Sequence, residues 1–318
     1  MNTKSLNTDL IEAIKESLPE KANLPNVLMD ILKIGKEAVY RRLRSEVPFT
    51  FAEALLISKA QGLSLDHLTS LPVNKRASFN MYLMEHEAPL EAYCHSMNSF
   101  IENCSALKDD PSTEWYTASN TIPHAFYMDH DHLLRFMLFK RIYQKGGLVK
   151  YYGELKVPGD IRRMQSRFIE VTKSLAYSCF IWDEMMFLSL VNDLRYFYDI
   201  NAITDQEKAL LKEDFLSLID ILENLAAKGR HGDGREVNFY ISNINFEATY
   251  SYLCTHAYRF SFVRLYEINS IYTADWNVFE YQRDWIQSLK KYSTLISVSG
   301  ERQRIQFFER QRSFVNKL

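Results

Sequence analysis

A single stretch decides how the N-terminal part of this chain folds: residues 28–67 read LMDILKIGKEAVYRRLRSEVPFTFAEALLISKAQGLSLDH. Apolar residues recur at helical spacing before Lys33 and after Gly35, so the stretch predicts two helices joined by a short connection. Thr50 and Glu53 then have the spacing of a capping box, which predicts the start of another helix. The stretch therefore indicates a compact bundle of short helices.

The flanking residues complete a predicted domain over residues 1–73. Ile11 and Ile14 fall on one face of an expected first helix, and Pro25 suits the first turn of a second. A third helix is expected over 36–44, a fourth from residue 50 and a fifth from residue 64. The helical pattern stops near residue 72, which predicts a boundary before a second domain over 76–318.

The second domain is expected to be mainly helical, with a small antiparallel β-meander. The spacing of apolar residues predicts helices over 76–108, 131–145, 158–177, 180–199, 205–228, 276–292 and 300–315. Alternating β-branched and aromatic residues predict three strands, over 237–242, 247–253 and 258–264. Residues 110–128 contain two prolines and are expected to be irregular. The fold class predicted for the whole chain is therefore mainly α.

Composition excludes several classes of protein. The 318 residues include 20 Phe, 19 Tyr and 4 Trp, too many aromatics for a disordered chain. The net charge of −2 provides no overall basic field for nucleic acid, so such binding needs a local patch. The four cysteines form no C-x-x-C pair, which argues against a zinc ribbon and favours free thiols in a reducing cytosol.

Targeting signals are not evident in the sequence. The first residues, MNTKSLNTDLIEA, contain no apolar signal-peptide core. The most apolar run, residues 179–191, is shorter than the roughly 20 residues of a membrane span and includes Asp183 and Glu184. We therefore expect a cytoplasmic protein that does not enter a membrane.

Basic charge is concentrated in one predicted helix. Residues 1–72 contain nine Lys or Arg and nine Asp or Glu, which gives no net charge. Residues 33–44 contain five basic residues against Glu37 alone, a net charge of +4. Such a helix is either a solvated surface or a site for a polyanion.

Residues 8–70 resemble the phage-repressor-like (Xre-type) helix-turn-helix domain. Apolar core positions of that family match Leu28, Leu32, Ile34 and Val39, and residues 60–66 match the end of its fourth helix. This sequence has Lys33 where the family usually has a turn glycine, Gly35 where it has Ser or Thr, and Arg42 where an apolar residue is common. The whole chain is also similar to a group of bacterial helix-turn-helix proteins, which share its tail at 290–297 and 300–305.

The resemblance implies a set of DNA-binding residues. In that family the second helix of the motif lies in the major groove. By position, Lys36, Glu37 and Arg41 would face the bases with Tyr40 beside them, and Lys33 and Arg44 would lie near phosphates. Lys and Arg donate to guanine O6 and N7, and a carboxylate accepts from cytosine N4. We therefore expect a sequence-specific transcriptional regulator that binds double-stranded DNA as a homodimer, with dimerisation in the second domain.

Other clusters give weaker hypotheses. Ser297, Ser299, Arg302 and Arg304 flank the start of the last helix and could hold an anion, or simply cap the helix. His130 and His132 are two residues apart and do not share a helix face, so no metal is expected there.

Aromatic residues of the second domain could line a cavity for an unknown small-molecule effector, or could form its core or a dimer interface. They are Tyr177, Phe180, Trp182, Phe187, Tyr196, Phe197, Tyr198, Tyr250 and Tyr252. No P-loop, nucleophile elbow, G-x-G-x-x-G or H-E-x-x-H motif occurs, so neither an enzyme nor a cofactor is expected. The alternative to a regulator is an interaction or scaffold protein with a vestigial helix-turn-helix module.

Overall fold

The computed structural model describes residues 3–18, 23–61, 63, 65, 77, 79–81, 89–144, 146, 149–265 and 269–318. The chain divides into two compact units. The smaller one consists of residues 1–79 and 273–279, and the larger one of residues 80–272 and 280–318. The predicted domain boundary near residue 73 lies outside the described residues.

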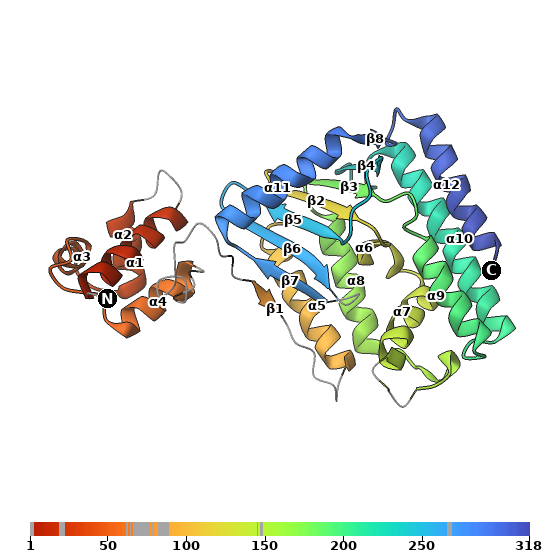
Figure 1. Ribbon diagram of the computed structural model, residues 1–318, viewed down its shortest axis with the longest axis horizontal. Helices are drawn as coiled ribbons and strands as arrows, with labels where there is room; N and C mark the ends of the chain where they lie inside the picture. Colours follow the sequence, from red (N-terminus) through yellow and green to blue (C-terminus); the bar gives the residue numbers. More distant parts are fainter. Residues whose placement is uncertain are drawn as a thin grey trace. The chain divides into compact units, whose positions relative to one another are not determined.

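The smaller unit contains four described helices, which are α1 (Thr3–Ser17), α2 (Leu24–Leu32), α3 (Lys36–Leu43) and α4 (Phe51–Gln61) (Figure 1). Asn23 caps α2 by accepting a hydrogen bond from the amide of Asn26, and the predicted Thr50–Glu53 capping box begins α4. Their buried core consists of Leu10, Ile14, Leu28, Leu32, Val39 and Ile57. The expected fifth helix lies mostly outside the described residues.

The larger unit is built on a mixed sheet with eight strands among the described residues, in the order β1-β7-β6-β5-β2-β3-β4-β8. The strands are β1 (Asn80–Met81), β2 (Glu114–Ser119), β3 (Tyr177–Trp182), β4 (Glu236–Ser242), β5 (Tyr250–Cys254), β6 (Arg259–Leu265), β7 (Asn269–Thr273) and β8 (Ser293–Leu295). Strands β2, β3 and β4 are parallel, and β5 and β8 flank them antiparallel.

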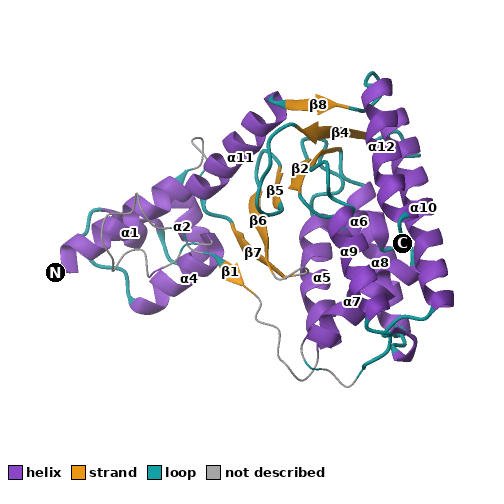
Figure 2. Ribbon diagram, turned by 45° about the vertical axis from the view of Figure 1, so that its right-hand side comes forward, coloured by secondary structure: helices purple, strands orange, loops and turns teal. Residues whose placement is uncertain are grey.

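Helices cover both faces of this sheet. They are α5 (Pro89–Ser105), α6 (His124–Tyr127), α7 (Asp131–Gln144), α8 (Gly159–Lys173), α9 (Leu188–Asp199), α10 (Asp205–Lys228), α11 (Trp276–Lys291) and α12 (Glu301–Asn316), with a 3-10 turn at Tyr152–Glu154. Figure 2 shows α11 on one side of the sheet and the other helices of the larger unit on the opposite side. On the α11 side, Gln287 donates to the hydroxyl of Tyr252 at 2.6 Å, and Lys290 lies over the rings of Tyr116 and Tyr240.

The predicted fold class is wrong for the larger unit, because a full mixed sheet replaces the small β-meander. Strand β2 runs through residues expected to be irregular, and β3 overlaps the start of a segment expected to be helical over 180–199. All residues of β2 except the first are buried, and so are all of β3 except the first. A strand buried on both faces lacks polar–apolar alternation, so its apolar run cannot be distinguished from a buried helix.

Two further elements differ from expectation. Strand β4 was expected to pair within the meander, but it lies between parallel β3 and antiparallel β8, and only β5 and β6 form the expected hairpin. A helix was expected over 76–108, whereas Asn80–Met81 form an edge strand and α5 begins at Pro89. Proline suits a first helical turn because it has no amide hydrogen to leave unbonded.

Within the described ranges, none of the helices combines the length and apolar character that crossing a membrane requires.

Candidate nucleic-acid interface

The turn between α2 and α3 brings the two helices into contact. Lys33 ends α2 in the left-handed conformation, with φ 53° and ψ 38°, and its amide donates to the carbonyl of Met29 at 2.9 Å. Gly35 is extended and begins α3 without a side-chain cap. Val39 is fully buried in the core that α3 shares with α2. This packing fixes which side of α3 faces outward.

The outward side of α3 carries the predicted DNA-binding residues. Lys36, Glu37, Tyr40, Arg41 and Arg44 are all exposed, and so is Lys33 in the preceding turn. At 3.6 residues per turn, positions 36, 37, 40 and 41 span about 140° of the helix circumference, and Arg44 follows as the C-terminal cap. The predicted residues therefore share one face, which leaves the opposite side of α3 for packing.

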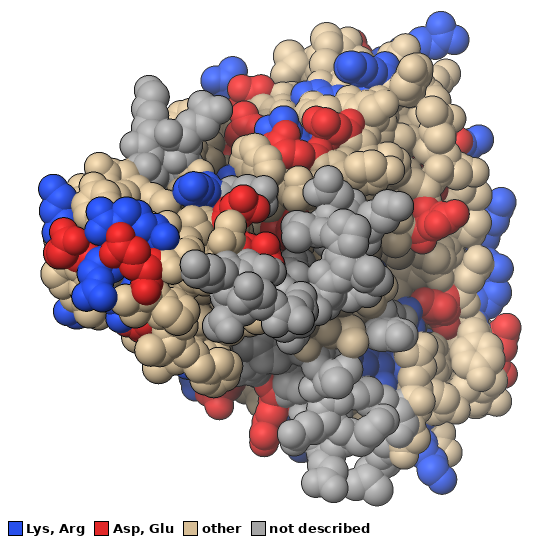
Figure 3. Space-filling model, turned by 60° about the vertical axis from the view of Figure 1, so that its left-hand side comes forward, with Lys and Arg blue, Asp and Glu red and all other residues tan. Residues whose placement is uncertain are grey.

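Ionic contacts join several of these side chains. In Arg44, Nη2 lies 3.2 Å from Oε1 of Glu37, and Nε lies 2.8 Å from Oε1 of Glu46. Nε of Arg41 lies 3.7 Å from Oε2 of Glu46. The carboxylate of Glu46 also raises the pKa of Arg44. Figure 3 shows basic and acidic side chains next to each other on the smaller unit, at the left of the view.

Glu46 is the residue of this surface that the sequence did not predict. It follows α3 and belongs to no helix, so helical spacing gives no signal for its position. Ser45 has a φ of 57°, which turns the chain, and the amide of Glu46 then bonds the carbonyl of Arg41 at 2.9 Å. With Glu46 included and Arg42 turned inward, the surface has four cations and two carboxylates, a net charge of +2 rather than +4.

Arg42 lies on the inner side of α3 and pairs with Glu53 at the start of α4. The guanidinium donates to both carboxylate oxygens, at 2.7 and 3.1 Å, and a third nitrogen donates to the carbonyl of Ala38. In the Xre-type helix-turn-helix family, which this unit resembles in sequence, the position of Arg42 commonly holds an apolar side chain. Here an ion pair takes the place of that apolar contact. Arg42 stabilises the helix arrangement and is not available at the outward face.

The four residues of the predicted anion site separate into two kinds. Ser297 is buried and its hydroxyl accepts from the amide of Phe239 at 2.7 Å, while Arg304 is buried and donates to the carbonyl of Ile296 at 2.9 Å. Ser299 and Arg302 are exposed. Because the buried pair bonds the backbone, those two residues hold β8 and α12 in place.

The run Asp129–His132 spreads its side chains in different directions. Asp131 pairs with Arg162 at 2.6 Å and Asp129 with Lys173 at 3.5 Å. His130 is buried, and burial lowers its pKa. Among the residues that the structure describes, no group of three or more His, Cys, Asp or Glu side chains is arranged to hold a metal ion.

Comparisons of the chain with protein-family models, with curated proteins and with solved structures found no significant match.

Proposed function

We propose that the smaller unit binds double-stranded DNA through the outward face of α3 and that the protein is a transcriptional regulator. One observation carries the proposal. Lys36, Glu37, Tyr40 and Arg41 are exposed together on a helix that follows a tight turn after α2, and Arg44 is exposed at the C-terminal cap of that helix. A short helix presented in this way, with guanidinium and ammonium groups on one side, suits the major groove.

The proposed roles of these side chains follow from their positions. Arg41 and Lys36 would donate to base edges, and Glu37 would accept from a base or orient Arg44, to which it is already hydrogen-bonded at 3.2 Å. Lys33 and Arg44 would contact phosphates, which contribute affinity but no sequence preference. The net charge of +2 makes the phosphate contribution small, so base contacts would carry much of the binding.

We further propose that two copies act together. A single small unit of this kind covers one half-site, and regulators of this class normally bind two half-sites as dimers. The larger unit would supply the dimer contacts, and the protein would act in the cytoplasm, where bacterial DNA lies. Light scattering of the full chain tests the dimer, and a monomer both with and without DNA would contradict it.

The DNA proposal is tested by selecting bound fragments of genomic DNA with the full-length protein at two salt concentrations. A short site with two-fold symmetry is the expected result, and no enrichment at either concentration would overturn the proposal. Arg41→Ala should then weaken binding to that site by about 1–3 kcal/mol. Arg44→Ala should weaken binding to all sequences and reduce the salt slope by about 1. Arg163→Ala on the larger unit, 76% exposed, is the matched control.

A second candidate function is protein–protein interaction, which one observation favours. Helix α4 has an exposed apolar side, where Phe51, Leu55 and Leu56 are 76%, 37% and 50% exposed. Exposed apolar groups of this kind are typical of contact surfaces. If this second function holds, Phe51→Ser and Leu56→Ser would each abolish a contact with a partner protein. Neither the wild type nor the variants would then bind DNA detectably.

A further inference from the structure

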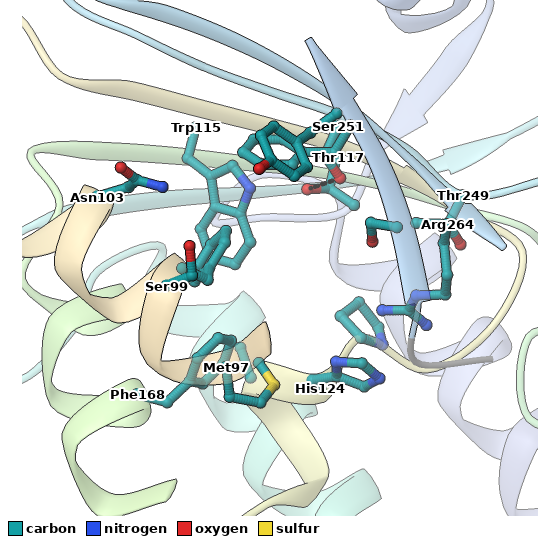
Figure 4. Close-up of a pocket in the computed structure, with 16 residues that line it drawn as sticks. Met97, Ser99, Asn103, Trp115, Thr117, His124, Phe168, Thr249, Ser251 and Arg264 are labelled. Carbon is teal, nitrogen blue, oxygen red and sulfur yellow. Dashed lines mark hydrogen bonds between the residues drawn. The ribbon is translucent and has the colours of Figure 1, made fainter. Parts of the chain in front are cut away.

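The aromatic residues expected to line a cavity do not line the one drawn in Figure 4. This cavity of about 120 Å³ lies in the larger unit, between the sheet and helices α5, α6 and α8. The ring centroid of Phe100, in its wall, lies 5.3 Å from that of Phe168 and 5.8 Å from that of Phe262. None of the nine expected residues, all of them within the described ranges, is among its walls. Because the rings that line it are already in contact with one another, the space belongs to the core.

One of the nine aromatic residues lies instead at the surface of the larger unit. Tyr250, at the start of β5, packs against Trp285 of α11 with ring centroids 4.8 Å apart, and the ring of Phe246 lies 6.3 Å from that of Trp285. Trp285 is nevertheless 36% exposed. Tyr292, just after α11, is 60% exposed, and Ile244, in the loop after β4, is 49% exposed. Exposed apolar groups that gather in this way are typical of contact surfaces.

Five exposed residues of the larger unit share the outer side of α11. They are Asp284, Trp285, Ser288, Lys291 and Tyr292. Tyr292 continues the last turn of the helix, since its amide donates to the carbonyl of Leu289 at 3.0 Å. At 3.6 residues per turn, the five positions span about 120° of the helix circumference. Asp284 and Lys291 form one edge of this outer side. Trp285 and Tyr292 form the other edge, with Ser288 between the two.

This pattern is complementary to itself when a second copy of the helix lies antiparallel. A two-fold axis at the level of Ser288 brings each edge against the same edge of the other copy. Asp284 lies four residues before Ser288 and Lys291 three after it, so the rotation brings their levels within about 1.5 Å of each other. Trp285 and Tyr292 match in the same way on the other edge. The small side chain of Ser288 allows the two helices to approach closely at the centre.

We propose that a second copy of this chain docks antiparallel on the outer side of α11. Each Asp284 faces Lys291 of the other copy, and each Trp285 faces Tyr292 of the other copy. Opposite charges fix the register of such a contact, and aromatic residues are enriched at the centre of interfaces. Asp284 lies 3.8 Å from Arg283 of its own helix, with 75% of its side chain exposed, so it is accessible to a closer cation. The inference rests on the proposed dimer and names its surface.

Charge reversal tests this register by sedimentation equilibrium of the full-length protein, at about 1–100 μM. The wild type should dimerise. Asp284→Lys sets two lysines against each other in both contacts, and Lys291→Asp sets two carboxylates against each other, so each variant should dimerise at least about ten-fold more weakly. An equimolar mixture of the two variants should recover the wild-type affinity, because the introduced lysine then faces the introduced aspartate and Lys291 faces Asp284. The variant with both changes should recover it as well.

Matched controls separate the interface from general effects of the substitutions. Lys228→Asp reverses an exposed lysine at the end of α10, the position that Lys291 has in α11, and should leave dimerisation unchanged. Tyr292→Ala should weaken dimerisation at least about ten-fold. Tyr196→Ala on α9, where the tyrosine is 56% exposed, should not. Recovery in the mixture shows that both charge-reversal variants are folded.

The outcomes distinguish this surface from the proposed function. A wild type that stays monomeric at about 100 μM, with and without DNA, would overturn the surface together with the proposed dimer. A wild type that dimerises, with charge-reversal variants that dimerise equally well or do not recover in the mixture, would overturn the α11 surface alone. A protein that shows the expected recovery but binds no DNA would support the α11 surface and contradict the DNA-binding proposal.

Discussion

Arg42 and Glu53 lie 11 residues apart and form an ion pair with two hydrogen bonds, from Nη2 to Oε1 at 2.7 Å and from Nε to Oε2 at 3.1 Å. The side chains are only 16% and 15% exposed. Oε2 of Glu53 also accepts from the amide of Thr50 at 2.8 Å, which begins α4. One carboxylate therefore joins α3 to the first turn of α4, and the orientation of the outward face of α3 depends on it.

The ion pair should contribute measurably to the stability of the smaller unit. Arg42→Met leaves the largely buried carboxylate of Glu53 without its guanidinium, and we expect the free energy of unfolding to fall by about 1–3 kcal/mol. A double-mutant cycle with Glu53→Gln should give a coupling energy of about 1–2 kcal/mol. Urea unfolding followed by the methyl NMR signals of Ile14 and Ile57, both fully buried in this unit, measures it in the full chain.

The matched control for this cycle is Arg41→Met. Arg41 lies on the outward face with its side chain 55% exposed, and its Nε lies 3.7 Å from Oε2 of Glu46. Its replacement should change the free energy of unfolding by less than about 0.5 kcal/mol. A coupling energy between Arg42 and Glu53 no larger than that would contradict the structural role assigned to the pair.

The same carboxylate should make this unit sensitive to acid. Burial opposes ionisation of Glu53, but the hydrogen bonds from Arg42 and from the Thr50 amide outweigh it and hold the pKa of Glu53 below its usual value. A depressed pKa in the folded state adds stability above the unfolded pKa of about 4.3, and this stability is lost as the pH falls through the folded pKa.

The stability difference between wild type and Glu53→Gln should therefore shrink as the pH is lowered from about 5 toward 3. Urea midpoints from the Ile14 and Ile57 methyl signals provide the measurement. Glu12→Gln, at an exposed position of α1, should show no such convergence. A difference that stays constant over this range would show that Glu53 titrates normally.

The contrast between these residues shows what the sequence could predict. The Thr50–Glu53 capping box joins residues three positions apart and was predicted, because local spacing alone determines it. The Arg42–Glu53 pair was not, because it depends on the path of residues 45–49. Asn7 of α1 fixes that path, with Nδ2 donating to the carbonyl of Arg42 at 3.2 Å and Oδ1 accepting from the amide of Phe49 at 2.9 Å.

The same distinction between local and long-range contacts explains the errors in the larger unit. Helices α10, α11 and α12 lie close to their predicted ranges, since each has a helical apolar pattern of its own. Pairing of β2 with β3 joins Glu114 to Tyr177, more than 60 positions along the chain, and no local pattern carries that information. The helix that carries the candidate DNA-binding face was predicted from its own local pattern, and the choice of DNA-binding residues on it came from the family resemblance. Glu46 beside that face was missed.

Replacing Glu46 should strengthen DNA binding if the outward face of α3 contacts DNA. Its carboxylate lies 2.8 Å from Arg44 and 3.7 Å from Arg41, so it competes with phosphates for both cations. Glu46→Gln should raise affinity at low salt and increase the salt slope, because phosphate contacts then release more counterions. Fluorescence anisotropy with a duplex at several salt concentrations measures both, with Glu12→Gln as the control. Unchanged affinity would show that Glu46 does not lie at the DNA-binding surface.

Lys33 offers a test in which stability and DNA binding should move in opposite directions. A lysine at φ 53° ends α2, where the left-handed conformation costs a residue with a Cβ about 1 kcal/mol relative to glycine. Lys33→Gly should therefore stabilise the smaller unit by roughly 0.5–1 kcal/mol. It also removes an exposed cation, so the salt slope of DNA binding should fall by about 1.

Lys33→Ala separates the two effects, since alanine removes the charge and keeps the backbone strain. Both variants should lose the same salt slope, and only the glycine variant should gain stability in urea. Equal stability of the two variants would mean that the turn at Lys33 is not strained, and an unchanged salt slope in both would mean that Lys33 does not lie near a phosphate.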